Sequence, residues 1–255
     1  MKRKIQRLEM TEGNYGACVS DPPTKTQTRR RIKEQPPAIA GLYYRAMADG
    51  TFKGYMPPGE PANVPRLKPR LCVGDFAALT LPHWRWVGFG TLHIWDQITG
   101  LERIEGEGVV AEHPLPPNVA FKHRAARYMP VWACPHRIEI VGVRAERLGE
   151  ISCADLEAEG LTWSVPPGTR WIPAQYFCRY PGCDDVFPDL GAAYRAEWDA
   201  LHGAGAWDPD DWVWVLDFKL CDPPSREAMA DSGPEPTSPS IASATEGYEG
   251  QGDEP

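Results

Sequence analysis

The stretch Trp212-Val-Trp-Val-Leu-Asp-Phe-Lys-Leu220 is the strongest strand signal in the chain, because aromatic and branched apolar residues fill most of it. A strand of this composition needs apolar partners. We therefore expect it to close the sheet of a small β-barrel, and the other elements of the chain are placed around it.

Shorter strands are expected upstream of this stretch, at Thr91 to Trp95, Gly108 to Glu112 and Arg137 to Ala145. A Gly-Asp turn within Leu71 to Phe76 leads into another apolar strand, which ends near Leu81. The aromatic residues of His83-Trp-Arg-Trp86 either stack on bases or belong to the barrel wall, and the wall is the favoured interpretation. Several short strands with Gly and Pro turns and few helices favour a barrel.

A short helix is expected after Ser152, which is a suitable N-cap with Asp155 three residues on, and Gly160 is placed to end it. Glu159 then lies in the last turn, where the helix dipole disfavours a carboxylate. It is therefore either an exposed glutamate without a role or a site residue that breaks a local rule.

A second helix is expected from Ala193 to His202, with Gly203 as its stop. Tyr194, Trp198 and Leu201 recur at helical spacing along it. This pattern predicts core residues rather than ligand contacts.

The densest chemistry lies in Thr24-Lys-Thr-Gln-Thr-Arg-Arg-Arg31, which holds one amine, three hydroxyls and three guanidiniums. Threonine favours extended backbone, and the planar donors of arginine match phosphate. The stretch is therefore either an exposed basic edge strand or a nucleic-acid or nucleotide site. Strict strand alternation would put Lys25 and Thr28 on opposite faces, so they share a pocket only if a turn or bulge separates them.

The 255 residues suffice for one large domain or two small ones. No apolar run approaches the roughly 20 residues of a membrane-spanning helix, and polar residues follow Met1-Lys-Arg-Lys4 where a signal peptide would be apolar. We expect a cytoplasmic protein that does not contact a membrane.

The charge is unevenly distributed. Residues 222–255 hold eight acidic residues and one arginine, so they carry −7 of the net charge of −8, whereas the first 33 residues hold nine Lys or Arg against three Asp or Glu. The tail has little to bury and is expected to be disordered. The basic beginning suits a phosphate backbone, and the tail either stays in solvent or competes for the same surface.

The seven cysteines are odd in number and scattered, which suits free thiols in a reducing compartment. Cys178 and Cys183 have a suggestive spacing, but the other candidate ligands, His113, Cys134 and His136, lie far upstream without a matching pair. No metal and no cofactor are expected.

Six short motifs follow one another along the chain: Lys25-Thr-Gln-Thr-Arg-Arg30, Val73-Gly-Asp75, Met129-Pro-Val-Trp132, Val143-Arg-Ala-Glu-Arg-Leu-Gly-Glu-Ile-Ser152, Asp155-Leu-Glu-Ala-Glu-Gly160 and Trp198…Trp207…Trp212-Val-Trp-Val-Leu-Asp-Phe218. In this order they resemble phage and prophage proteins of the ASCH type, within the PUA-like superfamily. The resemblance covers most of residues 20–220. It implies an α+β fold, a PUA-like small β-barrel with flanking helices and a cleft for RNA or modified nucleobases.

With this resemblance, residues 1–221 are expected to form one ASCH/PUA-like domain. The Pro- and Gly-rich segment near 35–69 is expected to be a long connection. The segment near 162–190 is expected to be an irregular insertion whose aromatic residues cover either a pocket or the barrel end. If the chain is phage-encoded, its place is the host cytoplasm.

A small bacterial ASCH enzyme that hydrolyses acetylcytidine carries a lysine, a threonine three residues later and a glutamate on the helix after the central strands. By motif, these are Lys25, Thr28 and Glu159. As an amidohydrolase acting on an acylated nucleoside, the protein would use Thr28 as nucleophile or to position water, Lys25 as base, and Glu159 to orient the lysine or shuttle a proton.

As a binding module, the protein would use the same three residues to bond the edge of a flipped or single-stranded base. Phosphate contacts would then come from the neighbouring residues Thr26, Arg29, Arg30, Arg31 and Lys33. The expected partner is RNA, DNA or a modified nucleoside.

Overall fold

The computed structural model describes residues 5–88, 91–96, 101–104, 106, 108–112, 122–164, 176–178 and 187–221. The predicted tail at 222–255, most of the insertion near 162–190, His113 and Cys183 lie outside the described residues. The described fold is mixed α/β, with mostly sheets and few helices.

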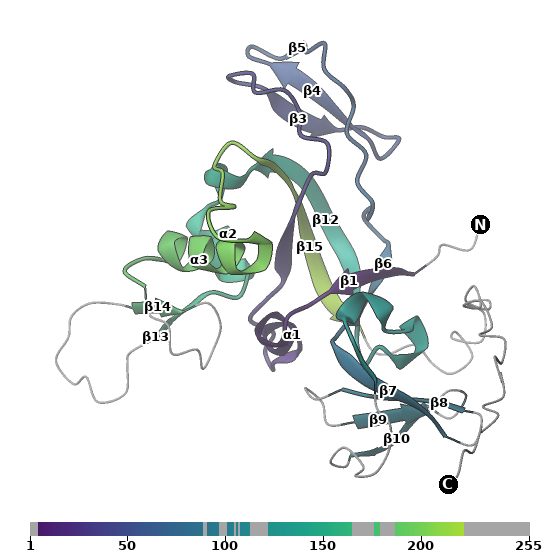
Figure 1. The fold of residues 1–255 in the computed structure, drawn as a ribbon. Coiled ribbons are helices and arrows are strands. Elements are labelled where there is room, and N and C mark those ends of the chain that lie inside the picture. Colours follow the sequence, from purple (N-terminus) through teal and green to yellow (C-terminus); the bar gives the residue numbers. More distant parts are fainter. Residues whose placement is uncertain are drawn as a thin grey trace, which may run out of the picture. The chain divides into compact units, whose positions relative to one another are not determined.

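The central sheet has five strands in the order β1-β6-β12-β15-β2 (Figure 1). These are β1 (Gln6–Glu9), β6 (Phe76–Thr80), β12 (Arg137–Arg147), β15 (Trp212–Cys221) and β2 (Gln27–Arg31). β1 is parallel to β6, and the other pairs are antiparallel. The aromatic stretch that begins at Trp212 thus forms an interior strand, as its apolar composition requires.

The predicted barrel is not closed by this sheet. β1 and β2 are its two edges, and among the described strands no ladder joins them. The strand that was expected to close a barrel, β15, pairs with β12 and β2, and the sheet stays open because β1 and β2 do not pair. The gap between β1 and β2 is where the candidate site is found.

A separate five-stranded sheet has the order β10-β9-β8-β7-β11. Its strands are β7 (His83–Gly88), β8 (Thr91–Trp95), β9 (Leu101–Ile104), β10 (Gly108–Glu112) and β11 (Lys122–Arg124). The strands expected at 91–95 and 108–112 are present, but they do not join the sheet of β15, because consecutive strands here pair with each other as hairpins. Trp86 is buried and stacks on His93, with ring centroids 5.1 Å apart.

The segment near 35–69 was expected to be a long connection, but part of it is regular structure. It forms a three-stranded sheet of β3 (Tyr43–Ala46), β4 (Phe52–Met56) and β5 (Glu60–Pro61). Tyr44 packs edge-on against Trp212 with centroids 5.0 Å apart, and Phe52 meets Trp214 in the same way. The small sheet is therefore held by the aromatic face of β15.

Three helices are described: α1 (Glu12–Val19), α2 (Cys153–Ala158) and α3 (Leu190–His202). The structure also contains a hairpin of β13 (Thr162–Ser164) and β14 (Tyr176–Cys178) and three 3₁₀ turns, η1 (Ala126–Tyr128), η2 (Val131–Ala133) and η3 (Leu148–Glu150). Ser152 caps α2 through the backbone N–H of Asp155, as predicted. Helix α1 and strand β1 were not predicted, because the first 24 residues show little periodicity.

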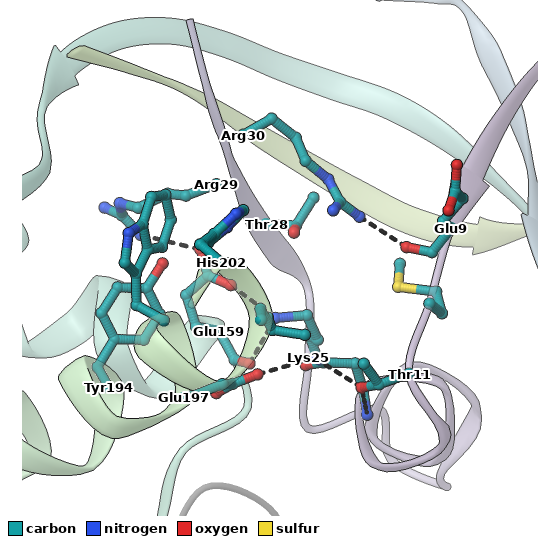
Figure 2. Close-up of a pocket in the computed structure, with 14 residues that line it drawn as sticks. Glu9, Thr11, Lys25, Thr28, Arg29, Arg30, Glu159, Tyr194, Glu197 and His202 are labelled. Atoms are coloured by element: carbon teal, nitrogen blue, oxygen red, sulfur yellow. Dashed lines mark hydrogen bonds and ion pairs between the residues drawn. The ribbon is translucent and has the colours of Figure 1, made fainter. Parts of the chain in front are cut away.

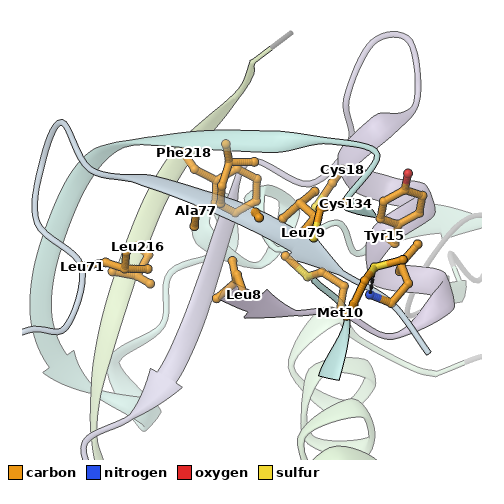
Figure 3. Close-up of a cluster of buried hydrophobic side chains, with 14 of the residues drawn as sticks. Leu8, Met10, Tyr15, Cys18, Leu71, Ala77, Leu79, Cys134, Leu216 and Phe218 are labelled. Carbon is orange, nitrogen blue, oxygen red and sulfur yellow. Dashed lines mark hydrogen bonds between the residues drawn. The ribbon is translucent and has the colours of Figure 1, made fainter. Parts of the chain in front are cut away.

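The main core lies between β1, β6, β12, β15 and α1, and it includes Leu8, Leu79 and Phe218 (Figure 3). A register shift between Ile140 and Gly142 breaks the strand alternation of β12. Ile140 is fully buried while Val141 is 48% exposed.

Within the described residues, no helix is both long and apolar enough to cross a membrane.

Candidate functional site

The candidate site is a pocket between the two edge strands of the central sheet. Its walls come from β1, the start of α1, β2 and the segment that enters it, the end of α2 and one face of α3 (Figure 2). Its lining includes the polar groups of Lys25, Thr28, Arg30, Glu159, Glu197 and Trp198. The structure therefore brings Lys25, Thr28 and Glu159 together from two distant parts of the sequence.

Backbone contacts fix Lys25 between the ends of two helices. Its own N–H donates to the carbonyl of Ala17 in α1 at 3.0 Å, and the N–H of Thr26 donates to the carbonyl of Ala158 in α2 at 2.8 Å. Gly160 has φ +93°, and a Cβ at this position would lie 3.1 Å from the Cβ of Lys25. The glycine that ends α2 thus permits both the turn and the close approach of the lysine.

Lys25 and Glu159 form a buried ion pair. The Nζ of Lys25 donates to Glu159 Oε2 at 2.6 Å and to the Glu159 carbonyl oxygen at 2.7 Å, and both side chains are 3% exposed. The interpretation of Glu159 as an exposed glutamate is therefore wrong. An ammonium has three N–H donors, so two bonds to Glu159 leave one for another group.

Arg29, which the sequence predicted as a phosphate contact, is buried and paired with carboxylates. Its side chain is fully buried and donates to Glu146 Oε1 at 2.5 Å and to Glu159 Oε1 at 3.2 Å, with Asp155 Oδ2 3.4 Å away. Burial opposes its charge, but the carboxylates of Glu159 and Glu146 raise the pKa of Arg29 above its ordinary value. The sequence pattern missed this, because a basic run does not reveal which arginine faces inward.

Gln27 links this cluster to the sheet and was not singled out by sequence. It donates to Asp155 Oδ1 at 3.0 Å and to Asp217 Oδ1 at 2.7 Å, and it accepts from Arg29 Nη1 at 2.6 Å. Burial acts to raise the pKa of Asp155, but the hydrogen bonds from Gln27 and Ser152 and the nearby guanidiniums hold that pKa well below its usual range. The network fixes the end of α2, and Glu159 with it.

Thr28 and Arg30 face the pocket from the other side of β2. The Thr28 hydroxyl lines the pocket and makes no hydrogen bond to any described residue. Arg30 donates from Nη2 to the backbone carbonyl of Glu9 on β1 at 2.8 Å (Figure 2). Burial lowers the pKa of Arg30 from its ordinary value.

Strand alternation does not separate Lys25 from Thr28, because Lys25 precedes β2. At Lys25 the chain pairs with Glu159 as an isolated bridge, whereas pairing with β15 starts at Gln27. This change of partner breaks the strand alternation between Lys25 and Thr28 and lets both side chains line one pocket.

The remaining predicted phosphate contacts lie away from this pocket. Thr26 and Lys33 are exposed, and neither lines it. Arg31 is exposed and pairs with Asp211, its Nε lying 2.8 Å from Asp211 Oδ2. Arg31 and Lys33 instead line a second, larger groove.

Helix α3 supplies the wall opposite β2. Tyr194 and Trp198 are buried, which confirms the core prediction for them, but they also line the pocket. The same prediction is wrong for Leu201, which is 47% exposed at the rim. Burial and the Glu159 carboxylate raise the pKa of Tyr194 well above its ordinary value, so it remains a neutral phenol.

Two polar groups on or near α3 were also missed by sequence. The buried indole N–H of Trp198 has no hydrogen-bond partner within the described part of the chain. The Nδ2 of Asn14 donates to Glu197 Oε1 at 2.8 Å, which ties α1 to α3 beside the pocket. No local sequence pattern marks either group, because the hydrogen bonding of each depends on how the helices pack together.

No group of three or more His, Cys, Asp or Glu side chains among the described residues is arranged to hold a metal ion. The pocket has a cavity volume of about 50 Å³. That is far below the roughly 300 Å³ at the lower end of small-molecule sites. A whole nucleoside therefore enters only if rim side chains such as Leu201 and His202 move.

Comparisons with protein-family models, with curated proteins and with solved structures find no match. The fold and site define a mixed α/β protein with an open five-stranded sheet and a buried lysine–glutamate pair between its edges.

Proposed function

We propose that the pocket between β1 and β2 binds the base of a nucleoside or nucleotide, and that the chain is a PUA-like protein of the ASCH type. The observation that carries this proposal is the meeting of three groups in one pocket: the lysine ammonium of Lys25, the unbonded hydroxyl of Thr28 and the carboxylate of Glu159. The motif resemblance implies these same three residue types.

The chemistry of the pocket suits the edge of a base. Lys25 has one N–H left over, Thr28 offers a hydroxyl that both donates and accepts, and Trp198 offers an unbonded indole N–H. Base edges present ring nitrogens and carbonyl oxygens as acceptors and amino groups as donors. The rings of Tyr194 and Trp198 give the pocket apolar walls.

Glu159 acts on a ligand through Lys25. Its two carboxylate oxygens are occupied, Oε2 by Lys25 and Oε1 by Arg29. Its role in binding is therefore to hold the lysine ammonium toward the pocket. Gln27 and Arg29 support that geometry from behind.

Amide hydrolysis is the second candidate function, favoured by the 2.6 Å contact between Lys25 Nζ and Glu159 Oε2. Along this contact the lysine can pass a proton to the carboxylate and then serve as a base. Thr28 would position the attacking water, or its hydroxyl would attack the acyl carbon first, release the amino base and leave a threonyl ester that water then hydrolyses. The water oxygen would bond to the acyl carbon, and the bond from that carbon to the exocyclic nitrogen of the base would break.

In this reaction the proton balance closes within the pair. Lys25 takes one proton from the water and returns one to the departing nitrogen, so the products are the free amino base and a carboxylic acid. Neither a metal nor a redox partner is consumed.

A panel of plain and acylated nucleosides tests both candidates. Binding is followed by calorimetry, and released acid by mass spectrometry. Thr28→Val is compared with Thr26→Val, which removes the same hydroxyl from an exposed position outside the pocket. We expect Thr26→Val to behave like the parent, whereas Thr28→Val abolishes turnover if the protein hydrolyses amides and weakens binding by about 1 kcal/mol if it only binds. The proposal fails if the parent protein binds no nucleoside and releases no acid.

A further inference from the structure

A second hollow lies beside the candidate site and is much larger, with a cavity volume of about 880 Å³. Its walls come from β1, from β2 and the residues just after it, from residues 66–71 and from β15. Glu9 and Arg30 line both this groove and the pocket. The side chain of Arg30, which bridges the two sheet edges, therefore lies between the pocket and the groove.

The groove is strongly basic, although the chain as a whole is acidic. Seven of its lining residues are cationic and two, Glu9 and Glu34, are anionic; the cationic residues are Arg7, Arg30, Arg31, Lys33, Arg66, Lys68 and Arg70. Local positive potential of this kind concentrates polyanions. Because the lysines and arginines come from three separate segments, only the fold assembles the surface.

Two of these cations, Lys33 and Lys68, are exposed and can bind a phosphate. Lys33 and Lys68 make no ion pair or hydrogen bond within the described part of the chain. Arg66 pairs with Asp49 at 3.1 Å, but both side chains are about half exposed, and such pairs contribute at most about 1 kcal/mol. A phosphate can therefore compete for Arg66 as well.

The floor of the groove is apolar where its rim is charged. Trp214, Leu8, Ile32 and Leu216 lie along it, and Trp214 is only partly buried. Grooves that bind single-stranded nucleic acid combine a cationic track for the backbone with apolar or aromatic surface for the bases. The bases of a duplex are paired and stacked inside it, so they cannot contact this apolar surface.

We propose that this groove holds the sugar–phosphate backbone of a single-stranded polynucleotide, with one of its bases directed past Arg30 into the pocket. The inference rests on the proposed function of the pocket and makes its ligand a base within a strand, of which the free nucleosides of the panel are the smallest fragment that still binds. Arg30 is placed to contact the phosphate next to that base, since it reaches both hollows. RNA and DNA share this backbone chemistry, and the experiment distinguishes them.

The test measures binding of short fluorescein-labelled RNA and DNA single strands, and of the matching duplex, by anisotropy over a salt series. Lys33→Glu/Lys68→Glu is compared with Lys53→Glu/Lys122→Glu, which makes the same charge change outside the groove. We expect the groove variant to lose roughly tenfold or more in single-strand affinity. Its log–log salt slope should flatten by about 1.4, that is, about 0.7 per lost phosphate contact. The control should change little, and the duplex should bind more weakly than either single strand.

Equal losses of single-strand affinity in the two double variants would overturn the proposed role of the groove. Tighter binding of the duplex than of the single strands would do the same. The nucleoside panel separates this failure from failure of the pocket. If nucleosides bind through Thr28 while the groove variant binds strands normally, the groove is wrong and the pocket stands. If nucleosides do not bind but strands require Lys33 and Lys68, the groove stands and the pocket assignment fails.

Discussion

Arg30 on β2 donates from Nη2 to the backbone carbonyl of Glu9 on β1 at 2.8 Å, and this side-chain contact crosses the gap between the two edges of the open sheet. A continued ladder would have closed the gap with backbone groups alone. Instead, the gap contains the pocket on one side of Arg30 and the basic groove on the other. The bridge therefore joins the two parts of the proposed binding surface.

Replacing Arg30 with alanine should weaken binding of single-stranded oligonucleotides to a similar extent for every sequence. A guanidinium that contacts a backbone phosphate does not distinguish one base from another. The log–log salt slope of Arg30→Ala should therefore flatten by about 0.7. The fold should persist, because β2 keeps its ladder with β15. The matched control is Arg45→Ala, on the exposed part of β3 outside both hollows. An unchanged slope in Arg30→Ala would show that Arg30 meets no phosphate.

Replacing Arg29 with methionine should reduce the free energy of unfolding by about 3–5 kcal/mol, because the buried carboxylate of Glu159 and the partly buried ones of Glu146 and Asp155 lose their shared partner. Arg144→Met is the comparison, since Arg144 contacts Glu146 and Asp155 from a position that is 36% exposed. Its loss should be smaller, as solvent can replace the missing charge. Urea unfolding measures the loss of stability in both variants. Equal losses would mean that burial does not set the importance of Arg29.

Asp155 should make the protein sensitive to acid. The folded-state pKa of its carboxyl lies below the unfolded value of about 3.9, so its contribution to stability is complete above that value and is lost as the pH falls toward the folded pKa. Asp155→Asn should therefore be less stable than the parent at neutral pH, and the difference should shrink in acid. Unfolding midpoints across a pH series measure this. A difference that stays constant with pH would contradict the prediction.

Deleting residues 222–255 should strengthen oligonucleotide binding at low salt, because this segment carries −7 of the net charge of −8. Salt should remove the gain, since screening shortens the reach of the segment's charge. The free energy of unfolding should stay the same, because the segment has little apolar surface to bury. Weaker binding, or a lower melting temperature of the truncated chain, would show that these residues support the domain.

Local signals were sufficient for the elements whose patterns are strong. The aromatic stretch from Trp212 predicted β15, and the box of Ser152 and Asp155 with Gly160 predicted both ends of α2. Such signals depend on neighbours within a few residues. Strand β1 and the sheet of β3, β4 and β5 escaped prediction because short strands with little alternation gain their stability from partners far along the chain.

For the site, the sequence by itself determined which residue types are present: a lysine and a threonine three residues apart, a run of arginines, and a glutamate at a capped helix end. Only the tertiary structure decided what each one does. It buried Arg29 among carboxylates, left Arg30 between two sheet edges, and set Lys25 against Glu159 across 134 residues of chain. The physical reason is that burial and charge pairing depend on which segments meet. A basic run specifies its charges, but not the direction in which each side chain will point.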